Sequence, residues 1–186
     1  DRTDRRTDLP AAATTAGAVV SALLTTGGLG VTVGGRTVCA GLSLEILPGQ
    51  SWALLGANGS GKTTLLHTLA GLRPAAGGTL RIDGATLAGL GPRERARHIA
   101  VLLQHSSRGF GASVLETVLT GRHPHLGPLA WEDADDLAIA RRAIDELDLT
   151  GLANRPLTTL SGGERRRVEI ARLLAQGSPL SLLDEP

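Results

Sequence analysis

The sequence predicts an α/β fold with a mostly parallel sheet and a helical subdomain. Three observations lead to this prediction. Apolar runs of strand length alternate with helical patterns near both ends of the chain, and residues 105–160 carry helical patterns alone. A glycine-rich stretch at 56–61 joins a strand pattern to a helix pattern. At 186 residues the chain is long enough for one domain with a substantial core.

The first half of the chain carries most of the strand patterns. Apolar residues gather there in short runs bounded by glycine or proline, which is typical of strands. The runs that predict strands are 29–33, 37–47, 51–56 and 77–84. The run "SWALLG" at 51–56 is almost wholly apolar and therefore predicts a buried strand. Leucines at helical spacing predict a helix over 62–72.

The second half carries most of the helical patterns. "GPRERARHIA" at 91–100 opens with proline, which suits the first turn of a helix. The apolar runs "AVLLQ" and "LSLL" predict buried strands at 100–104 and 180–183. The other predicted helices are 113–121, 131–149 and 160–177.

Composition and organisation limit the classes of function. We assign residues 1–22 to a flexible leader and residues 23–186 to one domain, with a helical subdomain at about 105–160. The net charge of +1 gives no reason to expect a nucleic-acid partner. No apolar run is long enough to span a membrane. Because the chain lacks methionine and stops at Pro186, we expect a fragment whose C-terminal strands are missing.

A phosphate-binding motif is the clearest functional signal. "GANGSGKT" at 56–63 fits the pattern G-x-x-x-x-G-K-[ST], in which glycines turn backbone N–H groups toward phosphate oxygens. Lys62 is the single lysine among 19 Lys and Arg residues, and in this pattern it reaches the β- and γ-phosphates of ATP. The predicted nucleotide-binding residues are Gly56, Ala57, Asn58, Gly59, Ser60, Gly61, Lys62, Thr63 and Thr64. The motif predicts a P-loop NTPase core.

Two carboxylates follow the last predicted strand. In P-loop NTPases a second strand carries an acidic residue to Mg²⁺, so Asp184 and the Thr63 hydroxyl are the predicted metal ligands. Glu185 stands next in line and is placed to act as the general base for an attacking water. Taken alone, the Asp-Glu-Pro stretch is better explained as a polar turn that caps a strand, but its pairing with the phosphate loop favours the role in metal binding.

A third motif resembles the signature sequence of the ATP-binding cassette (ABC) ATPases. It is "LSGGERRRVEIARLLAQ" at 160–176, and Ser161 lies 23 residues before Asp184. The resemblance implies that Ser161, Gly162 and Gly163 contact the γ-phosphate held by a second subunit, in a head-to-tail homodimer around two ATP molecules. A purely structural alternative is a capping box between Ser161 and Glu164 at a helix start.

The same resemblance assigns a role to Gln104, at the end of the strand that leads into the helical subdomain. There it implies a residue that contacts both Mg²⁺ and the attacking water, followed by a loop that meets integral-membrane permease subunits. The implied catalytic residues are therefore Glu185, Gln104 and Lys62, with ATP and Mg²⁺ as cofactors.

The stretches "DGATLAGLGPRERARHIAVLLQ" and "VLETVLTGRHPHLG" narrow the resemblance to importer ATPases for cobalamin, iron-siderophores and haem. Cobalamin is our first choice of cargo, with siderophore and haem next. The resemblance implies a peripheral position on the cytoplasmic face of the bacterial inner membrane, and an indirect partner in a periplasmic or lipid-anchored substrate-binding protein.

The chain departs from the family at two places. Val33 stands where these ATPases usually have an aromatic residue that stacks on adenine. The family also continues beyond the Asp-Glu-Pro stretch, to a histidine that contacts the γ-phosphate. We therefore expect residues 1–186 alone to bind MgATP weakly and to lack a normal turnover rate. Two alternatives stay open, a soluble ABC protein outside transport and a nucleotide-binding remnant without hydrolysis.

Overall fold

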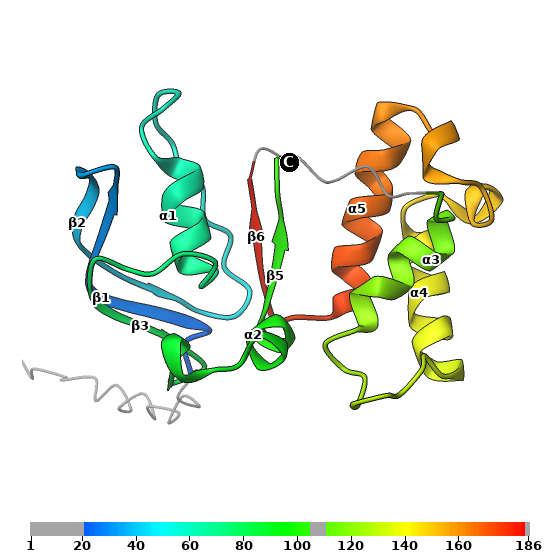
Figure 1. Cartoon of the computed structure of the whole chain (residues 1–186), viewed down its shortest axis with the longest axis horizontal. Helices are drawn as coiled ribbons and strands as arrows, with labels where there is room; N and C mark the ends of the chain where they lie inside the picture. The colour runs from blue at the N-terminus through cyan, green and yellow to red at the C-terminus, as the bar shows by residue number, and fades with distance from the viewer. Residues whose placement is uncertain (1–20, 105–110, 185–186) are drawn as a thin grey trace, which may run out of the picture.

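The computed structural model describes residues 21–104 and 111–184, and it has two sheets and a group of helices (Figure 1). The α/β class expected from the sequence is confirmed. The parallel strands are the pair β5 (Ile99–Leu102) and β6 (Leu180–Leu183). The larger sheet is antiparallel, with the order β2-β1-β3-β4, which the sequence patterns did not indicate.

The antiparallel sheet begins with a hairpin. Strands β1 (Leu24–Val33) and β2 (Arg36–Ile46) are joined by Gly34 and Gly35, which have positive φ angles of 54° and 75°. Two such residues suit a tight turn between twisted strands, and glycine adopts that conformation without strain. The remaining strands and the short helical turns are β3 (Gly77–Ile82), β4 (Ala85–Thr86), η1 (Leu87–Gly89), η2 (Thr120–Arg122), η3 (Thr150–Leu152) and η4 (Leu157–Thr159).

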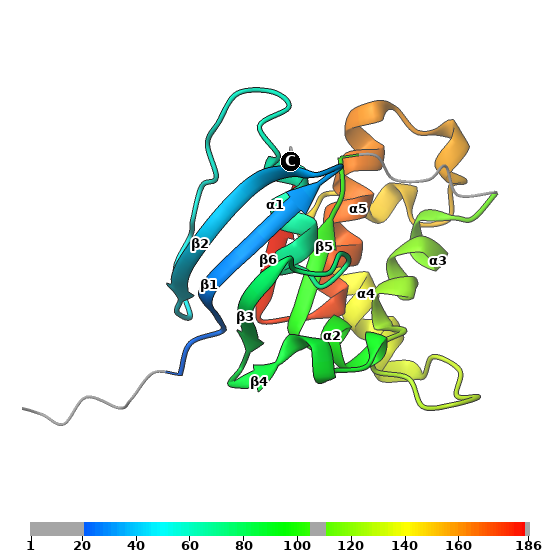
Figure 2. The same ribbon diagram turned by 60° about the vertical axis from the view of Figure 1, so that its left-hand side comes forward.

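Helix α1 (Lys62–Leu69) lies between the antiparallel sheet and the β5–β6 pair (Figures 1 and 2). Its buried leucines share one core with residues of both sheets. That core contains Leu24, Leu29, Val31, Ile46, Leu65, Leu69, Ile82, Leu87, Ile99, Leu180 and Leu182. This packing fixes the start of α1, and therefore the glycine-rich loop before it, relative to the end of β6.

The β5–β6 pair is covered on both faces, as parallel strands usually are. Ile99 faces the core around α1, whereas the next residue, Ala100, faces the opposite side together with Leu102. On that second side both residues pack against Leu173 of helix α5 (Gly162–Gln176). Alternate strand residues point to opposite faces, so this short pair joins two cores.

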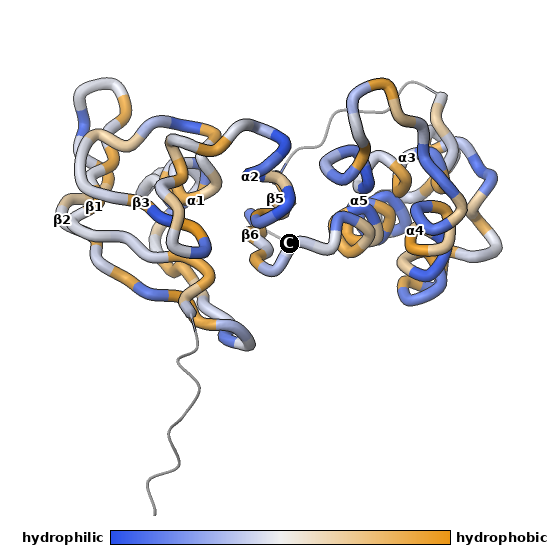
Figure 3. The backbone as a smooth tube through the Cα atoms, turned by 90° about the horizontal axis from the view of Figure 1, so that it is seen from below, coloured by the Kyte–Doolittle hydropathy of each residue, from blue (hydrophilic) through white to orange (hydrophobic). Residues whose placement is uncertain are grey.

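A second large core lies among α3 (Val114–Leu119), α4 (Ala134–Glu146) and α5. Helix α2 (Pro92–His98) precedes β5, and its proline stands in the first turn as expected. Seen from below, α2, β5 and β6 lie between the antiparallel sheet and the three packed helices (Figure 3). Each of α3, α4 and α5 starts with a capping box, formed by Ser113, Asp133 and Ser161 respectively.

The buried strand predicted at 51–56 is wrong. These residues form no regular strand, and Trp52 and Leu55 are 63% and 87% exposed. A strand is stabilised by hydrogen bonds to a neighbouring strand, and neither sheet of the described residues includes this segment. Its apolar composition therefore does not lead to burial.

A buried ion pair connects α4 to the segment that follows α3. Arg122 Nε donates to Asp136 Oδ1 at 2.8 Å, and both side chains are nearly buried. The Arg122 bond is the main cause that lowers the pKa of Asp136 below its usual value, and the backbone N–H of Asp133 and the positive field of Arg122 and His125 lower it further. The preceding Gly121 lies so close to the Arg172 carbonyl of α5 that a Cβ would overlap it.

We expect Asp136→Asn to lower the free energy of unfolding by about 3 kcal/mol at neutral pH, because it leaves the buried Arg122 cation without its counter-ion. The pKa of Asp136 is lowered by folding, so the pair stabilises fully above pH ~4 and loses its effect as the pH falls through the lowered pKa. Urea unfolding at pH 7 and pH 3 measures this difference. An equal difference between wild type and variant at both pH values would contradict it.

Candidate nucleotide site

The glycine-rich loop between residues 56 and 61 has the backbone shape of a phosphate cradle. Gly59 and Gly61 have φ angles of 74° and 99°, in the region that glycine tolerates best. Ser60 N donates to Ala57 O at 3.2 Å, which closes a turn. A Cβ on Gly61 would overlap the side chain of Val38 on β2, so this strand packs directly over the loop.

Lys62 is the first residue of α1, and its ammonium group lies over the loop. Lys62 Nζ donates to the carbonyl oxygens of Gly56 at 2.9 Å and Ala57 at 3.1 Å. The start of α1 has no side-chain cap and no acidic residue in its first turn. Its first N–H groups are therefore turned toward the loop together with a positive charge, which is an arrangement that attracts an anion.

Thr63 and Asp184 bring the other half of the site to the same place. Thr63 Oγ1 donates to Asp184 Oδ1 at 3.1 Å, although the two residues are 121 positions apart. The backbone of Asp184 is held by Leu102 O of β5, at 2.9 Å from its N–H. Two oxygen ligands for a cation, a hydroxyl and a carboxylate, are thus adjacent at the edge of the loop.

The second carboxylate oxygen of Asp184 shows that this site suits a metal ion. Asp184 is 5% exposed, and its Oδ2 is buried with no hydrogen-bond partner among the described residues. A buried anion without a partner is costly, and a divalent cation with a preference for oxygen ligands would satisfy it. The residues present therefore fit Mg²⁺ at Thr63 and Asp184.

Gln104 follows β5 at the same edge of the parallel pair. Leu102 and Leu183 are paired in register; Asp184 directly follows Leu183, and Gln104 lies two residues beyond Leu102. Gln104 is exposed. Glu185, the predicted general base, lies outside the described residues.

The signature residues lie elsewhere in the chain. Ser161 is the N-cap of α5, where its Oγ accepts from Glu164 N at 3.3 Å and Glu164 Oε2 accepts from Ser161 N at 2.6 Å. These bonds to Ser161 lower the pKa of Glu164. Ser161, Gly162 and Gly163 are exposed, and α5 lies across the β5–β6 pair from α1 (Figures 1 and 3). One chain therefore does not bring its signature to its own phosphate loop.

The predicted nucleotide-binding residues divide between two elements. The residues of the loop are Gly56, Ala57, Asn58, Gly59, Ser60 and Gly61, and those in the first turn of α1 are Lys62, Thr63 and Thr64. Sequence reasoning did not identify Val38 as the residue that covers Gly61, because nothing in the local pattern of β2 marks it. Val33, expected near adenine, is the last residue of β1 and is partly exposed.

Two kinds of feature do not occur among the described residues. None of their helices combines the length and apolar character needed to cross a membrane. Residues 21–104 and 111–184 also contain no group of three or more histidine, cysteine, aspartate or glutamate side chains that could hold a metal ion.

Comparison with known proteins agrees with this geometry. The family model described as ABC transporter matches residues 39–186. The chain is 45% identical over 164 residues to a hemin import ATP-binding protein of Streptomyces coelicolor, covering 88% of this chain and 58% of the relative. It is 36% identical to an iron(3+)-hydroxamate import ATP-binding protein of Bacillus subtilis, covering 88% of this chain and 61% of that protein.

Solved structures give the same result. The chain superimposes with a TM-score of 0.75 and 34% identity on a structure described as an inward-facing metal-chelate type ABC transporter, covering 89% of this chain and 60% of that one. The TM-score is 0.76, at 26% identity, for a nucleotide-free ATP-binding cassette, of which 69% is covered. The chain spans about 60% of the length of its curated relatives and belongs to the ABC transporter family.

Proposed function

We propose that this chain is the nucleotide-binding part of an ATPase that powers a bacterial importer of iron chelates, either haem or a siderophore. The observation that carries the proposal is the contact between Thr63 and Asp184, beside a buried Asp184 oxygen that lacks a partner among the described residues. It supports a cation site at the edge of a phosphate cradle, which is the arrangement that a P-loop NTPase needs.

In this proposal the residues position ATP rather than react with it. The N–H groups of the loop and the Lys62 ammonium hold the phosphates, and Thr63 and Asp184 hold Mg²⁺. Bound Mg²⁺ supplies charge neutralisation on the phosphate oxygens. Gln104 and Glu185 would orient and deprotonate the attacking water.

We further propose that the complete site forms between two copies of the protein. Ser161, Gly162 and Gly163 are exposed and lie across the β5–β6 pair from the phosphate loop. A second copy turned head to tail would bring its own exposed signature to the phosphates of the first. The homodimer would therefore account for the exposure of both the glycine-rich loop and the signature residues in one chain.

The cargo is proposed from the relatives. The Streptomyces protein is named for hemin import and the Bacillus protein for iron(3+)-hydroxamate import. These names favour haem or siderophore over cobalamin, our first choice from the sequence. Permease subunits would anchor the ATPase at the cytoplasmic face of the membrane, with a substrate-binding protein on the other side.

Replacement of Lys62 tests the phosphate cradle in the full-length protein. We expect both Lys62→Ala and Lys62→Arg to lower ATP hydrolysis by at least roughly 100-fold, because a broad guanidinium does not replace a compact ammonium held by two loop carbonyls. Phosphate release measures the rate, and Arg73→Gln, an exposed change beyond the far end of α1, is the control. Normal hydrolysis by Lys62→Ala would refute the ATPase proposal.

Replacement of Asp184 tests the metal site separately. Wild-type protein should bind ATP at least about tenfold more tightly with Mg²⁺ than with EDTA, and Asp184→Asn should remove that difference. Equilibrium binding of a fluorescent ATP analogue measures both constants. Asp83→Asn, at the exposed β3–β4 turn, is a matched loss of a carboxylate and should keep the wild-type ratio. An unchanged ratio in Asp184→Asn would contradict the assignment.

A further inference from the structure

The stretch "GRHPH" at 121–125 has no place in the nucleotide site, yet it makes several long-range polar contacts. It follows α3 and lies against the C-terminal end of α5, the helix whose other end carries Ser161. Gly121 permits this approach, because a Cβ there would overlap the Arg172 carbonyl. The stretch therefore approaches the last turns of α5 closely.

Two side chains of this stretch form hydrogen bonds with the last carbonyl groups of α5. Arg122 donates from a terminal guanidinium nitrogen to Ala175 O at 2.9 Å, while its Nε holds Asp136 of α4. His125 Nε2 lies 2.8 Å from Gln176 O, so the ring nitrogen donates its proton to that carbonyl. The last carbonyls of a helix lack partners within the helix, and hydrogen-bond donors here also complement the negative end of its dipole.

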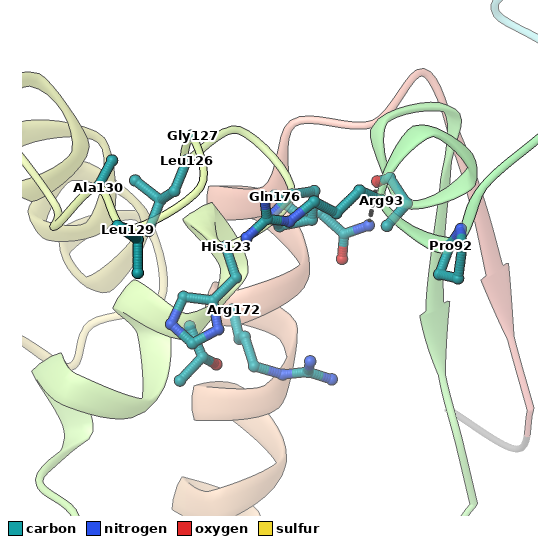
Figure 4. A pocket seen from close by; sticks show the side chains of 12 residues that line it. Pro92, Arg93, His123, Leu126, Gly127, Leu129, Ala130, Arg172 and Gln176 are labelled. Atoms are coloured by element: carbon teal, nitrogen blue, oxygen red, sulfur yellow. Dashed lines mark hydrogen bonds between the residues drawn. The ribbon is translucent and has the colours of Figure 1, made fainter.

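The same place is connected to the strand that leads to Gln104. The Gln176 side-chain amide donates to Ala96 O at 2.6 Å and to Ile99 O at 3.1 Å, at the end of α2 and the start of β5. Arg97 of α2 donates to Pro124 O at 2.8 Å. Figure 4 shows Gln176 between the end of α5 and α2, beside a hollow of about 550 Å³. The stretch thus forms a joint between α5 and the β5 region.

We propose that Arg122 and His125 are positioning residues for ATP hydrolysis, because they fix the end of α5 and so set where Ser161 lies at its other end. The inference rests on the proposed function, in which Ser161 completes the site of a second copy. Neither side chain contacts nucleotide in this proposal.

Because α5 is long, a small tilt at its C-terminal end displaces Ser161, at its N-terminal end, by a larger distance. With 15 residues, α5 is about 22 Å long at about 1.5 Å per residue. A tilt of about 5° at Gln176 would displace Ser161 by about 2 Å over that length. Misplacement of a positioning group by about 1 Å can cost about 100-fold in rate. Arg166 also ties α5 to Leu103 O, at 3.1 Å, which limits the tilt.

The test uses the full-length protein with three variants. His125→Ala removes the donor, and His125→Gln keeps an amide N–H that can reach Gln176 O. His123→Ala is the matched control, because the His123 side chain is 59% exposed and its Nε2 lies 3.4 Å from Glu132 Oε1. We measure the ATP turnover number and, separately, the dissociation constant of a non-hydrolysed ATP analogue.

We expect His125→Ala to lower the turnover number about tenfold, less than the about 100-fold limit because Arg166 still holds α5. Nucleotide affinity should change by less than about twofold, since the phosphate loop is not touched. His125→Gln should recover most of the rate, and His123→Ala should match wild type. Equal rates for the two alanine variants, or a parallel loss of nucleotide affinity and rate, would overturn the proposal.

A distance measurement decides the proposal without hydrolysis. Spin labels at Arg165→Cys on α5 and Arg81→Cys on β3, in a Cys39→Ser background, report the direction of α5 relative to the sheet. Loss of the His125 donor should broaden the distance distribution, and His123→Ala should not. An unchanged width would overturn the proposal that His125 fixes the end of α5, even if the wild type hydrolyses ATP normally. If His125→Ala does not fold, His125→Asn, whose amide is too short to reach Gln176 O, replaces it in both experiments.

Discussion

The hydrogen bond from Thr63 to Asp184 joins the two halves of the nucleotide site, which are 121 residues apart. One half is the start of α1, held by the core that α1 shares with both sheets. The other half is the end of β6, held by its pairing with β5. Both supports pack in the same core, which holds the phosphate cradle next to the metal ligands, and the proposed chemistry depends on this closeness.

The β5–β6 pair has a second role, as the wall between two cores. Its one face packs with α1 and its other face with α5. Movement of α5 along that wall would leave the phosphate loop unchanged while shifting Ser161. The phosphate loop therefore lies on one side of the β5–β6 pair. Ser161, which would contact a second copy in the proposed dimer, lies on the other side.

Features encoded by local spacing could be predicted from the sequence, and features that depend on distant partners could not. The phosphate loop, the proline at the start of α2 and the capping box at Ser161 each follow from residues within one turn or loop. The segment 51–56 has the apolar composition of a strand but forms none. A strand also needs a second strand to pair with, and the local sequence does not say whether one lies beside it. Arg122 likewise finds Ala175 O across 53 positions. The metal site combines both kinds of feature. The sequence shows the motifs that contain Thr63 and Asp184, but only the fold brings the two residues together.

The position of Lys62 has a practical consequence. Residues 1–186 contain one side-chain amine, and it lies over the phosphate cradle between two carbonyl oxygens. An amine-directed reagent can therefore modify few places on this chain besides the cradle itself and a free N-terminus. Acylation kinetics, followed by mass spectrometry, would report directly whether the cradle is covered. A scarcity of lysine turns an ordinary protein-labelling reaction into a local probe of site occupancy.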